Sequence, residues 1–293
     1  MTNNYIGLPT TNRQPMNALA RLDAPTTNDE LAEPDSAAAV DDGPNKRDLI
    51  AGLEKGLAVI EAFDQDRPRL TISEVAARCN LTRAAARRYL ITLEYLGYVS
   101  SDRKMYSLSP KVLRLGQSYM HSARLPRIVQ PELHKLAYAL KEASSAGVLD
   151  GDDVICIAAT EAGRLVSSTL QPGTRVPAYC TANGRVLLST KTPEEVDAWL
   201  ARQTPEPRTP HTLTDSDELR AEIARVRSQG YATVDQEFEL GLRTISVPLK
   251  NYRGEVLAAM NISAQASRVS LEQLISDCLP ALLQAQARLR STL

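Results

Sequence analysis

The segment TISEVAARCNLTRAAARRYLITLEYL (Thr71–Leu96) decides the fold of the first part of this chain. Thr71 and Glu74 have the spacing of a capping box, which predicts a short helix that ends at a tight break near Asn80. Thr82 is placed to cap a second helix. Two helices joined by about three residues, with basic and small residues in the first turns of the second, are the pattern of a helix-turn-helix.

The second predicted helix carries a basic face. Arg83, Arg87 and Arg88 are expected to point outward, and the run Ala84–Ala86 keeps the start of the helix thin enough to enter a major groove. Arginine suits both guanine edges and phosphate oxygens. The alternative is a surface helix whose basic face is only solvated. The face predicted to lie inward carries Leu81, Ala85, Tyr89 or Leu90, Leu93 and Leu96.

A basic hairpin follows this helix in the sequence. YVSSDRKMYSLS (Tyr98–Ser109) alternates as two short strands around a tip that contains Arg103 and Lys104. Such a wing can reach phosphates or the minor groove. Because the capped helix, the short turn and the basic hairpin occur together, we interpret this region as a winged helix-turn-helix that binds DNA. The residues expected to bind DNA are Thr82, Arg83, Arg87, Arg88, Arg103 and Lys104.

The composition argues against several other classes of protein. The formal net charge of -1 gives no general attraction to nucleic acid, so DNA affinity must come from a local patch. The four cysteines and three histidines are scattered without metal-ligand spacing, so we expect no metal and no cofactor. We find no secretory segment and no apolar run near roughly 18 residues, and we expect a cytoplasmic protein.

Four regions are expected along the chain. Residues 1–46 are poor in large apolar groups and are predicted to be a disordered arm. Residues 47–109 are the predicted DNA-binding domain, and 110–125 are predicted to form a linker helix. Residues 126–293 contain five or six predicted strands with helices before and after them, which is typical of an α+β domain.

The strands of the last region are predicted from alternation and turn residues. A hairpin with a Gly-Asp turn covers SSAGVLDGDDVICIAATE (144–161), and RLVSSTL (164–170) follows it. Later, YATVDQEF (231–238) precedes a second hairpin in TISVPLKNYRGEVLAAMNIS (244–263). Helices are predicted at Thr192–Leu200, at Ser216–Gln229 and from Ser270.

The chain resembles the IclR family of bacterial transcriptional regulators from about Leu53 to its end. The matching segments are LEKGLAVIEAF, LTISEVAARCNLTRAAARRYLITLEYLGYV, TLQPGTRVPAYCTANGRVLLST and GYATVDQEFELGLRTISVPLKNYRGEVLAAMNIS. The last two segments are similar to the PcaR/PcaU/PobR subgroup, whose members control the catabolism of aromatic acids through the β-ketoadipate pathway.

The resemblance implies a linker helix that dimerises and an effector-binding domain related to GAF folds, with a central antiparallel sheet. It also implies that backbone N–H groups of Thr181–Asn183 face the carboxylate of a small acid. The family often has an acidic residue where this chain has Val234, which implies a less polar wall, and Asp235 stands next to it. The residues implied to bind the effector are Val176, Thr181, Ala182, Asn183, Asp235, Thr244, Asn261 and Ser263.

Other residues leave alternatives open. Asp235, Glu237 and Glu239 would share one face of a strand, where they could do acid–base chemistry or pair with Arg243 and Arg253. Cys180 is either a nucleophile or a small buried residue. Two arginines that flank the implied effector loop either neutralise a ligand carboxylate or lie on the surface, namely Arg175 and Arg185.

We therefore predict a transcription factor, not an enzyme, that binds operator DNA and a small carboxylic acid. The expected effector is protocatechuate, 4-hydroxybenzoate or β-ketoadipate. The expected assembly is a homodimer or homotetramer, with RNA polymerase as a further partner to consider. The alternatives are a small-molecule enzyme that uses Cys180 or the region of Asp235 and Glu237, and an architectural DNA binder without a ligand.

Overall fold

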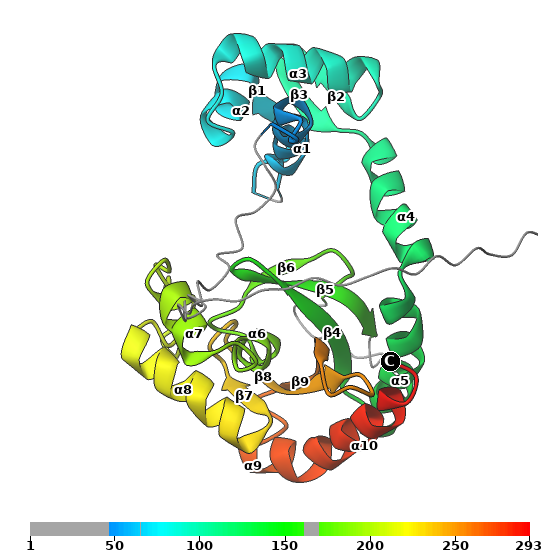
Figure 1. Cartoon of the computed structure of the whole chain (residues 1–293), viewed down its shortest axis with the longest axis vertical. Coiled ribbons are helices and arrows are strands. Elements are labelled where there is room, and N and C mark those ends of the chain that lie inside the picture. The colour runs from blue at the N-terminus through cyan, green and yellow to red at the C-terminus, as the bar shows by residue number, and fades with distance from the viewer. Residues whose placement is uncertain (1–46, 65, 161–169) are drawn as a thin grey trace, which may run out of the picture. The chain divides into compact units, whose positions relative to one another are not determined.

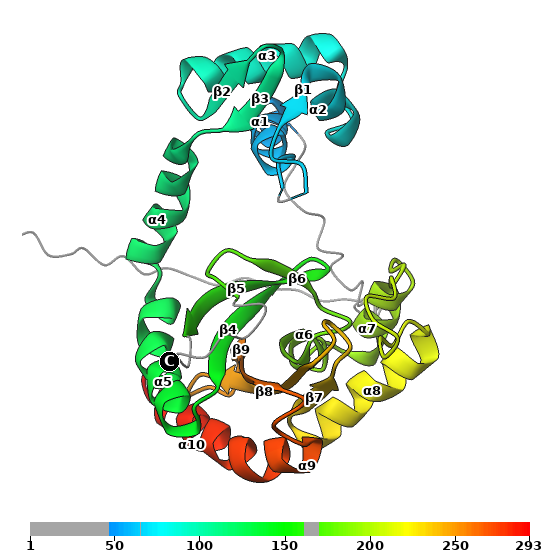
Figure 2. The same cartoon turned by 180° about the vertical axis from the view of Figure 1, so that it is seen from behind.

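The computed structural model describes residues 47–64, 66–160 and 170–293. The expected arm at 1–46 and residues 164–169 of the strand predicted after the first hairpin lie outside the described residues. In the described part of the chain, no helix is both long and apolar enough to cross a membrane. Figure 1 and Figure 2 show an N-terminal unit with a small sheet and a C-terminal unit with a larger one.

The N-terminal unit is a winged helix-turn-helix, as the sequence predicts. The three-stranded sheet has the order β1-β3-β2 and is antiparallel throughout. Its core is apolar and includes Val75, Leu90 and Val99. The elements are α1 (Ala51–Glu61), β1 (Leu70–Thr71), α2 (Ile72–Arg78), α3 (Arg83–Tyr95), β2 (Val99–Asp102) and β3 (Met105–Leu108).

The local signals that start the two central helices are present as expected. The Thr71 hydroxyl accepts from the Glu74 N–H while the Glu74 carboxylate accepts from the Thr71 N–H, which forms the capping box of α2. Asn80, with φ of 50°, forms the break before α3. On the inward face of α3, Leu90 and Leu93 are buried as predicted, but Ala86 is buried in place of Ala85 and Leu96 is exposed.

Two helices lead from the wing to the larger sheet. A 3₁₀ turn (Pro110–Val112) precedes α4 (Leu113–Ser122), and α5 (Arg124–Leu140) follows directly. α5 contains both Pro126 and Pro131. Pro126 occupies the first turn, where a missing N–H costs nothing.

The C-terminal unit is built on a six-stranded antiparallel sheet, as expected. The strand order is β6-β5-β4-β9-β8-β7, so two hairpins are joined through the central pair β4–β9. The first hairpin turns at Gly151, whose φ of 61° lies in the left-handed region. The strands are β4 (Ala143–Asp150), β5 (Asp153–Thr160), β6 (Arg175–Pro177), β7 (Ala232–Asp235), β8 (Leu242–Lys250) and β9 (Val256–Gln265).

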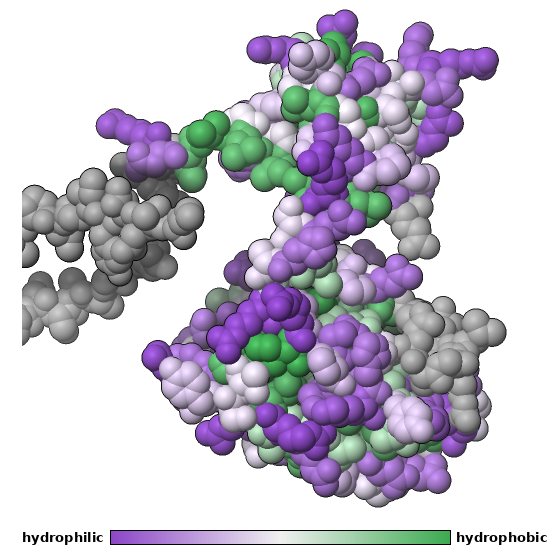
Figure 3. All heavy atoms as spheres, turned by 90° about the vertical axis from the view of Figure 1, so that its right-hand side faces the viewer, coloured by the Kyte–Doolittle hydropathy of each residue, from purple (hydrophilic) through white to green (hydrophobic). Residues whose placement is uncertain are grey.

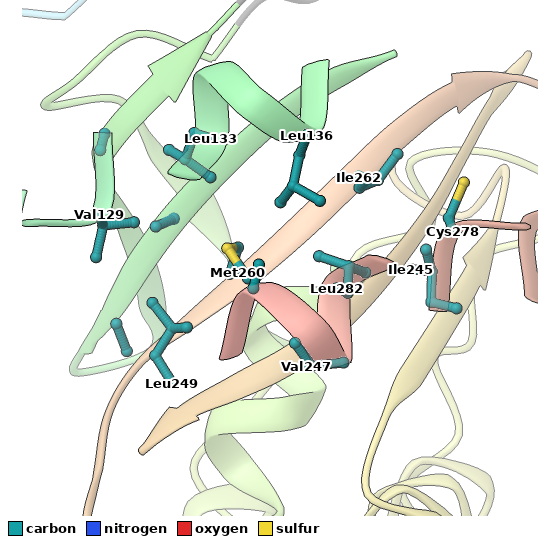
Figure 4. Packing of buried hydrophobic residues seen from close by; sticks show 14 of the residues in the cluster. Val129, Leu133, Leu136, Ile245, Val247, Leu249, Met260, Ile262, Cys278 and Leu282 are labelled. Atoms are coloured by element: carbon teal, nitrogen blue, oxygen red, sulfur yellow. The ribbon is translucent and has the colours of Figure 1, made fainter. Parts of the chain in front are cut away.

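Helices pack on both faces of this sheet. Ile245, Val247 and Leu249 alternate on β8 and contact α5 and the C-terminal helices through one apolar core (Figure 4). The second core lies on the other face, among the helices that follow β6. These helices are α6 (Ala182–Leu188), α7 (Pro193–Leu200) and α8 (Ser216–Gln229); the C-terminal ones are α9 (Leu271–Gln273), a π-helical turn (Leu274–Cys278) and α10 (Leu279–Arg290).

The exposed surface is largely hydrophilic, with hydrophobic areas between the polar groups on the face that Figure 3 presents. Several large apolar side chains are nevertheless exposed on the two connecting helices. They are Leu113, Leu115 and Tyr119 on α4 and Tyr138 on α5. Grouped apolar side chains at a surface are typical of association sites.

Candidate functional site

The exposed face of α3 carries the three arginines that the sequence singles out. The Thr82 hydroxyl accepts from the Ala85 N–H at 3.2 Å, so Thr82 is the N-cap, and the basic residues lie in the first turns that follow. Arg83, Arg87 and Arg88 are all exposed. Within the described residues, none of these guanidinium groups forms a hydrogen bond or an ion pair. They are therefore available to an external anion such as a DNA phosphate.

The wing ends in a two-residue turn made of two basic residues. Asp102 pairs with Met105 across the hairpin, and the intervening Arg103 and Lys104 have φ of 51° and 86°. A turn with positive φ at both positions usually contains Asn or Gly, because other side chains are strained there. An ion pair of 3.0 Å between Arg69 and Asp102 joins the end of β2, next to the tip of the wing, to the segment before β1.

A cavity opens in the C-terminal unit between the sheet and the start of α6. It has about 600 Å³ of space that protein atoms do not fill, including its opening to solvent. The lining is mainly apolar with a few polar groups, which is typical of small-molecule sites. The lining residues are Ser145, Val154, Cys156, Leu170, Val176, Cys180, Thr181, Ala182, Asn183, Val234, Phe238, Leu242, Thr244, Asn261 and Ser263.

The structure brings together seven of the eight residues expected to bind an effector. Val176, Thr181, Ala182, Asn183, Thr244, Asn261 and Ser263 all line the cavity. Asp235 does not, because its carboxylate is bonded to the Arg243 guanidinium at 2.7 Å. The hydrogen bond from Arg243 lowers the pKa of Asp235 and opposes the effect of partial burial. Val234 lines the wall instead.

The polar groups of the cavity are held in fixed orientations. The Ser145 hydroxyl donates to Asn261 Oδ1 at 2.6 Å, and Asn261 Nδ2 donates to the Ser263 hydroxyl at 3.2 Å. The Ser246 hydroxyl donates to Asn183 Oδ1, also at 2.6 Å. Since no described residue accepts from Asn183 Nδ2, this amide presents oriented N–H donors to the cavity.

The Thr181 hydroxyl is bonded within the protein. The hydroxyl donates to the Pro177 carbonyl at 2.9 Å and accepts from the Gly184 N–H at 3.3 Å. Its one proton is therefore already used. Thr181 caps α6 and shapes the cavity, and only its remaining acceptor capacity faces a ligand.

Gly184 allows α6 to lie against the chain that precedes it. A Cβ at this position would be 2.1 Å from the Ala178 carbonyl oxygen, well inside van der Waals contact. Glycine is thus required by close packing at the third position of the helix. This contact holds the Thr181–Asn183 segment at the cavity wall.

A buried ion pair that the sequence did not predict joins α6 to the segment after β7. Arg185 binds Glu237 through two hydrogen bonds of 2.7 and 2.5 Å, and its Nε donates to the Tyr179 carbonyl at 3.0 Å. The exposed fractions of the two side chains are 1% and 9%. Arg185 is therefore occupied within the protein, while Arg175 pairs with Asp150 and Asp153 at the surface.

The prediction that Asp235, Glu237 and Glu239 share one face of a strand is wrong. β7 ends at Asp235, and Gln236 has φ of 62°, which breaks the alternation. Glu237 turns inward to Arg185, and Asp235 binds Arg243. The three acids therefore do not gather into one catalytic or metal-binding group.

Cys180 is a buried cavity residue. Burial raises the pKa of its thiol to about 11, and burial does the same to Cys156, which also lines the cavity. The reactive thiolate is therefore disfavoured at neutral pH. Of the two alternatives for Cys180, a nucleophile or a small buried residue, this environment favours the small buried residue.

Two family models match most of the chain and agree with this architecture. The IclR helix-turn-helix domain matches residues 52–103, and the C-terminal domain of the bacterial transcriptional regulator IclR matches residues 117–291. The chain belongs to the IclR family of bacterial transcriptional regulators.

Relatives that are 36–43% identical to this chain belong to the PcaR/PobR-like subgroup. The chain is 43% identical to the Pca regulon regulatory protein of Pseudomonas putida, over 88% of this chain and 93% of that protein. It is 37% identical to the p-hydroxybenzoate hydroxylase transcriptional activator of Acinetobacter baylyi, over 89% and 97%. Among solved structures, the chain is similar to the PobR inducer-binding domain from Acinetobacter, a double mutant in complex with 3-hydroxybenzoic acid. The two sequences are 31% identical, the match covers 58% of this chain and 100% of that one, and the TM-score is 0.56.

Proposed function

We propose that this protein controls genes for the catabolism of aromatic acids and responds to a small organic acid that binds in the C-terminal cavity. The observation that carries the proposal is the cavity itself. Seven residues at the positions implied by the family line one apolar space, and Asn183 presents oriented amide donors to it. The relatives that regulate Pca and p-hydroxybenzoate genes support the same class of effector. Candidate effectors are protocatechuate, 4-hydroxybenzoate and β-ketoadipate.

The proposed DNA-binding surface consists of the N-terminal part of α3 and the tip of the wing. Its side chains are exposed, and their charges would compensate those of phosphates and recognise guanine edges. This local basic patch would supply the DNA affinity that the near-neutral net charge of the whole chain cannot supply. The residues are Thr82, Arg83, Arg87, Arg88, Arg103 and Lys104.

The proposed regions are a DNA-binding domain at 47–109, a linker helix at 110–125 and an effector-binding domain at 126–293. We propose that the chain acts as a homodimer or homotetramer, since exposed apolar residues of α4 such as Leu113 and Leu115 need a partner surface. A dimer would read half-sites roughly 34 Å apart, one turn of DNA, or a multiple of this. The effector would act through different affinities for two arrangements of the subunits.

A gel-shift assay on the intergenic DNA upstream of the coding region tests this function. We expect a specific shift at moderate salt, and a change in its midpoint with at least one of the three acids. No specific shift would refute DNA regulation by this chain. A shift indifferent to all three acids would favour an architectural DNA binder, and turnover of an acid would favour an enzyme.

A matched pair of variants ties the response to the cavity. Thr244→Val removes a hydroxyl from the lining while keeping the shape of the side chain, and Thr233→Val makes the same change on β7 outside the lining. We expect Thr244→Val to raise the acid concentration for half response about tenfold, as for a lost hydrogen bond. Thr233→Val should leave the response unchanged. Equal responses of the two variants would place the effector elsewhere.

A further inference from the structure

Phe238 contributes an aromatic ring to the cavity wall. It is one of only two phenylalanines in the chain, and it lies in the segment between β7 and β8. Its neighbours in the lining, Val234 and Leu242, are aliphatic. The planar face of an aromatic ring distinguishes it from them, because it can stack on another ring.

The segment beside this ring is fixed by residues from a different part of the sequence. The Thr209 hydroxyl donates to the Gln236 carbonyl at 2.7 Å, and the Thr212 hydroxyl donates to the Glu237 carbonyl at 2.6 Å. The Leu213 N–H donates to the Glu237 carboxylate at 3.1 Å. A loop held at three points is pre-organised, so little entropy is lost when a ligand contacts it.

A buried ion pair and a further arginine complete the support of this segment. The buried Arg185–Glu237 pair ties the residue next to Phe238 to α6, which contributes Ala182 and Asn183 to the lining. The Arg208 guanidinium lies 4.8 Å from the centroid of the Phe238 ring, within the range of a cation–π contact. The segment is thus restrained through its backbone, and the ring through one of its faces.

We propose that Phe238 makes the cavity selective for an acid with an aromatic ring, and that Arg185–Glu237 and Arg208 are positioning residues that hold Phe238 in place. The inference rests on the proposed function, since it assigns a specificity to the same cavity. Stacked or edge-to-face rings gain about 0.5–1.5 kcal/mol beyond the area that they bury. This converts to about a two- to tenfold preference over a saturated ring of the same size.

The test uses two acids that differ only in the ring. 4-Hydroxybenzoate and trans-4-hydroxycyclohexanecarboxylate carry the same carboxylate and hydroxyl groups, and isothermal calorimetry on the full chain gives both affinities. We expect the unmodified protein to prefer the aromatic acid. Phe238→Leu, which keeps an apolar side chain, should lower this preference about two- to tenfold, mainly by weakening binding of the aromatic acid.

Phe63→Leu is the matched control, because it makes the same substitution at the only other phenylalanine, in the N-terminal unit. It should leave both affinities within a factor of two. If Phe238→Leu weakens both acids equally, the ring only fills space and the inference is wrong. If the protein responds to β-ketoadipate but to neither ring acid, the inference also fails while the proposed function stands. Binding of no acid at all would overturn both.

The positioning role is tested by combining substitutions. Arg208 is exposed, so Arg208→Gln should fold, and it should lower the preference for the aromatic acid about twofold. In the Phe238→Leu background the same change should have no effect on the preference, because the ring that it positions is absent. Glu237→Gln should show the same dependence on Phe238 if it folds. Effects of Arg208→Gln that are equal in both backgrounds would refute the positioning role.

Discussion

The helices α3 and α6 begin alike and serve opposite purposes. Each has a threonine N-cap whose hydroxyl accepts from the third residue of the helix, and each carries arginine soon after. In α3 the arginines are exposed and without partners among the described residues. In α6, Arg185 is 1% exposed and bound to Glu237. The same residue type is thus open to external anions on one helix and bound in an internal ion pair on the other, and burial makes the difference.

Breaking the buried Arg185–Glu237 ion pair should have the largest effect, and this effect is on the free energy of unfolding. Arg185→Met keeps most of the side-chain volume but leaves Glu237 buried without its cation, which costs about 3–5 kcal/mol of the free energy of unfolding. Urea denaturation measures this loss. The double variant Arg185→Met with Glu237→Leu should recover much of it, because an apolar pair can replace a buried ion pair at little cost. A single variant as stable as the unmodified protein would mean that the two helices do not differ as described.

The contrast also explains which features the sequence predicts. The capping box at Thr71, the cap at Thr82 and the bounds of α8 at Ser216–Gln229 depend on residues that are close along the chain, and all are found as expected. Local patterns determine local structure, so a single sequence is enough for them.

The features that sequence analysis missed depend on contacts between distant residues. Arg185 and Glu237 are 52 residues apart, and no local sequence pattern around either residue predicts that they pair. The alternation of Asp235 with Glu237 looks like a strand face, but a left-handed residue at Gln236 ends it. Phe238 was not singled out, because one aromatic residue in a loop carries no periodic signal.

The surface arginines should give the next largest effect, and on a different property. Arg83→Ala with Arg87→Ala should weaken operator binding about 100-fold, at about tenfold for each lost contact. Fluorescence anisotropy over a range of salt concentrations measures it, and the slope against salt should fall by about 0.9 for each arginine that contacts a phosphate.

The stability of this double variant should hardly change, which sharpens the comparison with Arg185. Exposed substitutions away from caps and cores alter the free energy of unfolding by less than about 0.5 kcal/mol. Arg220→Ala, at an exposed arginine of α8, is the matched control for DNA binding. If the double variant loses effector binding as strongly as DNA binding, then α3 is a folding element and not a reader.

The third residue of the helix also differs between α3 and α6, and this difference should have the smallest effect. It is Ala85 in α3 and Gly184 in α6. Gly184→Ala would place a Cβ 2.1 Å from the Ala178 carbonyl, so α6 must shift, at a cost of about 1–3 kcal/mol in the free energy of unfolding. The shift would move Thr181–Asn183 and so weaken effector binding as well.

Gly116→Ala in α4 is the control for this change, since no atom lies within 4 Å of the Cβ it would add. There the substitution should stabilise the helix by about 0.5–1 kcal/mol, because alanine is the better helix former. Thermal unfolding of both variants should therefore give shifts of opposite sign. Two shifts of the same sign would show that helix propensity, not the contact with Ala178, governs α6, and the close approach that holds the cavity wall would lose its support.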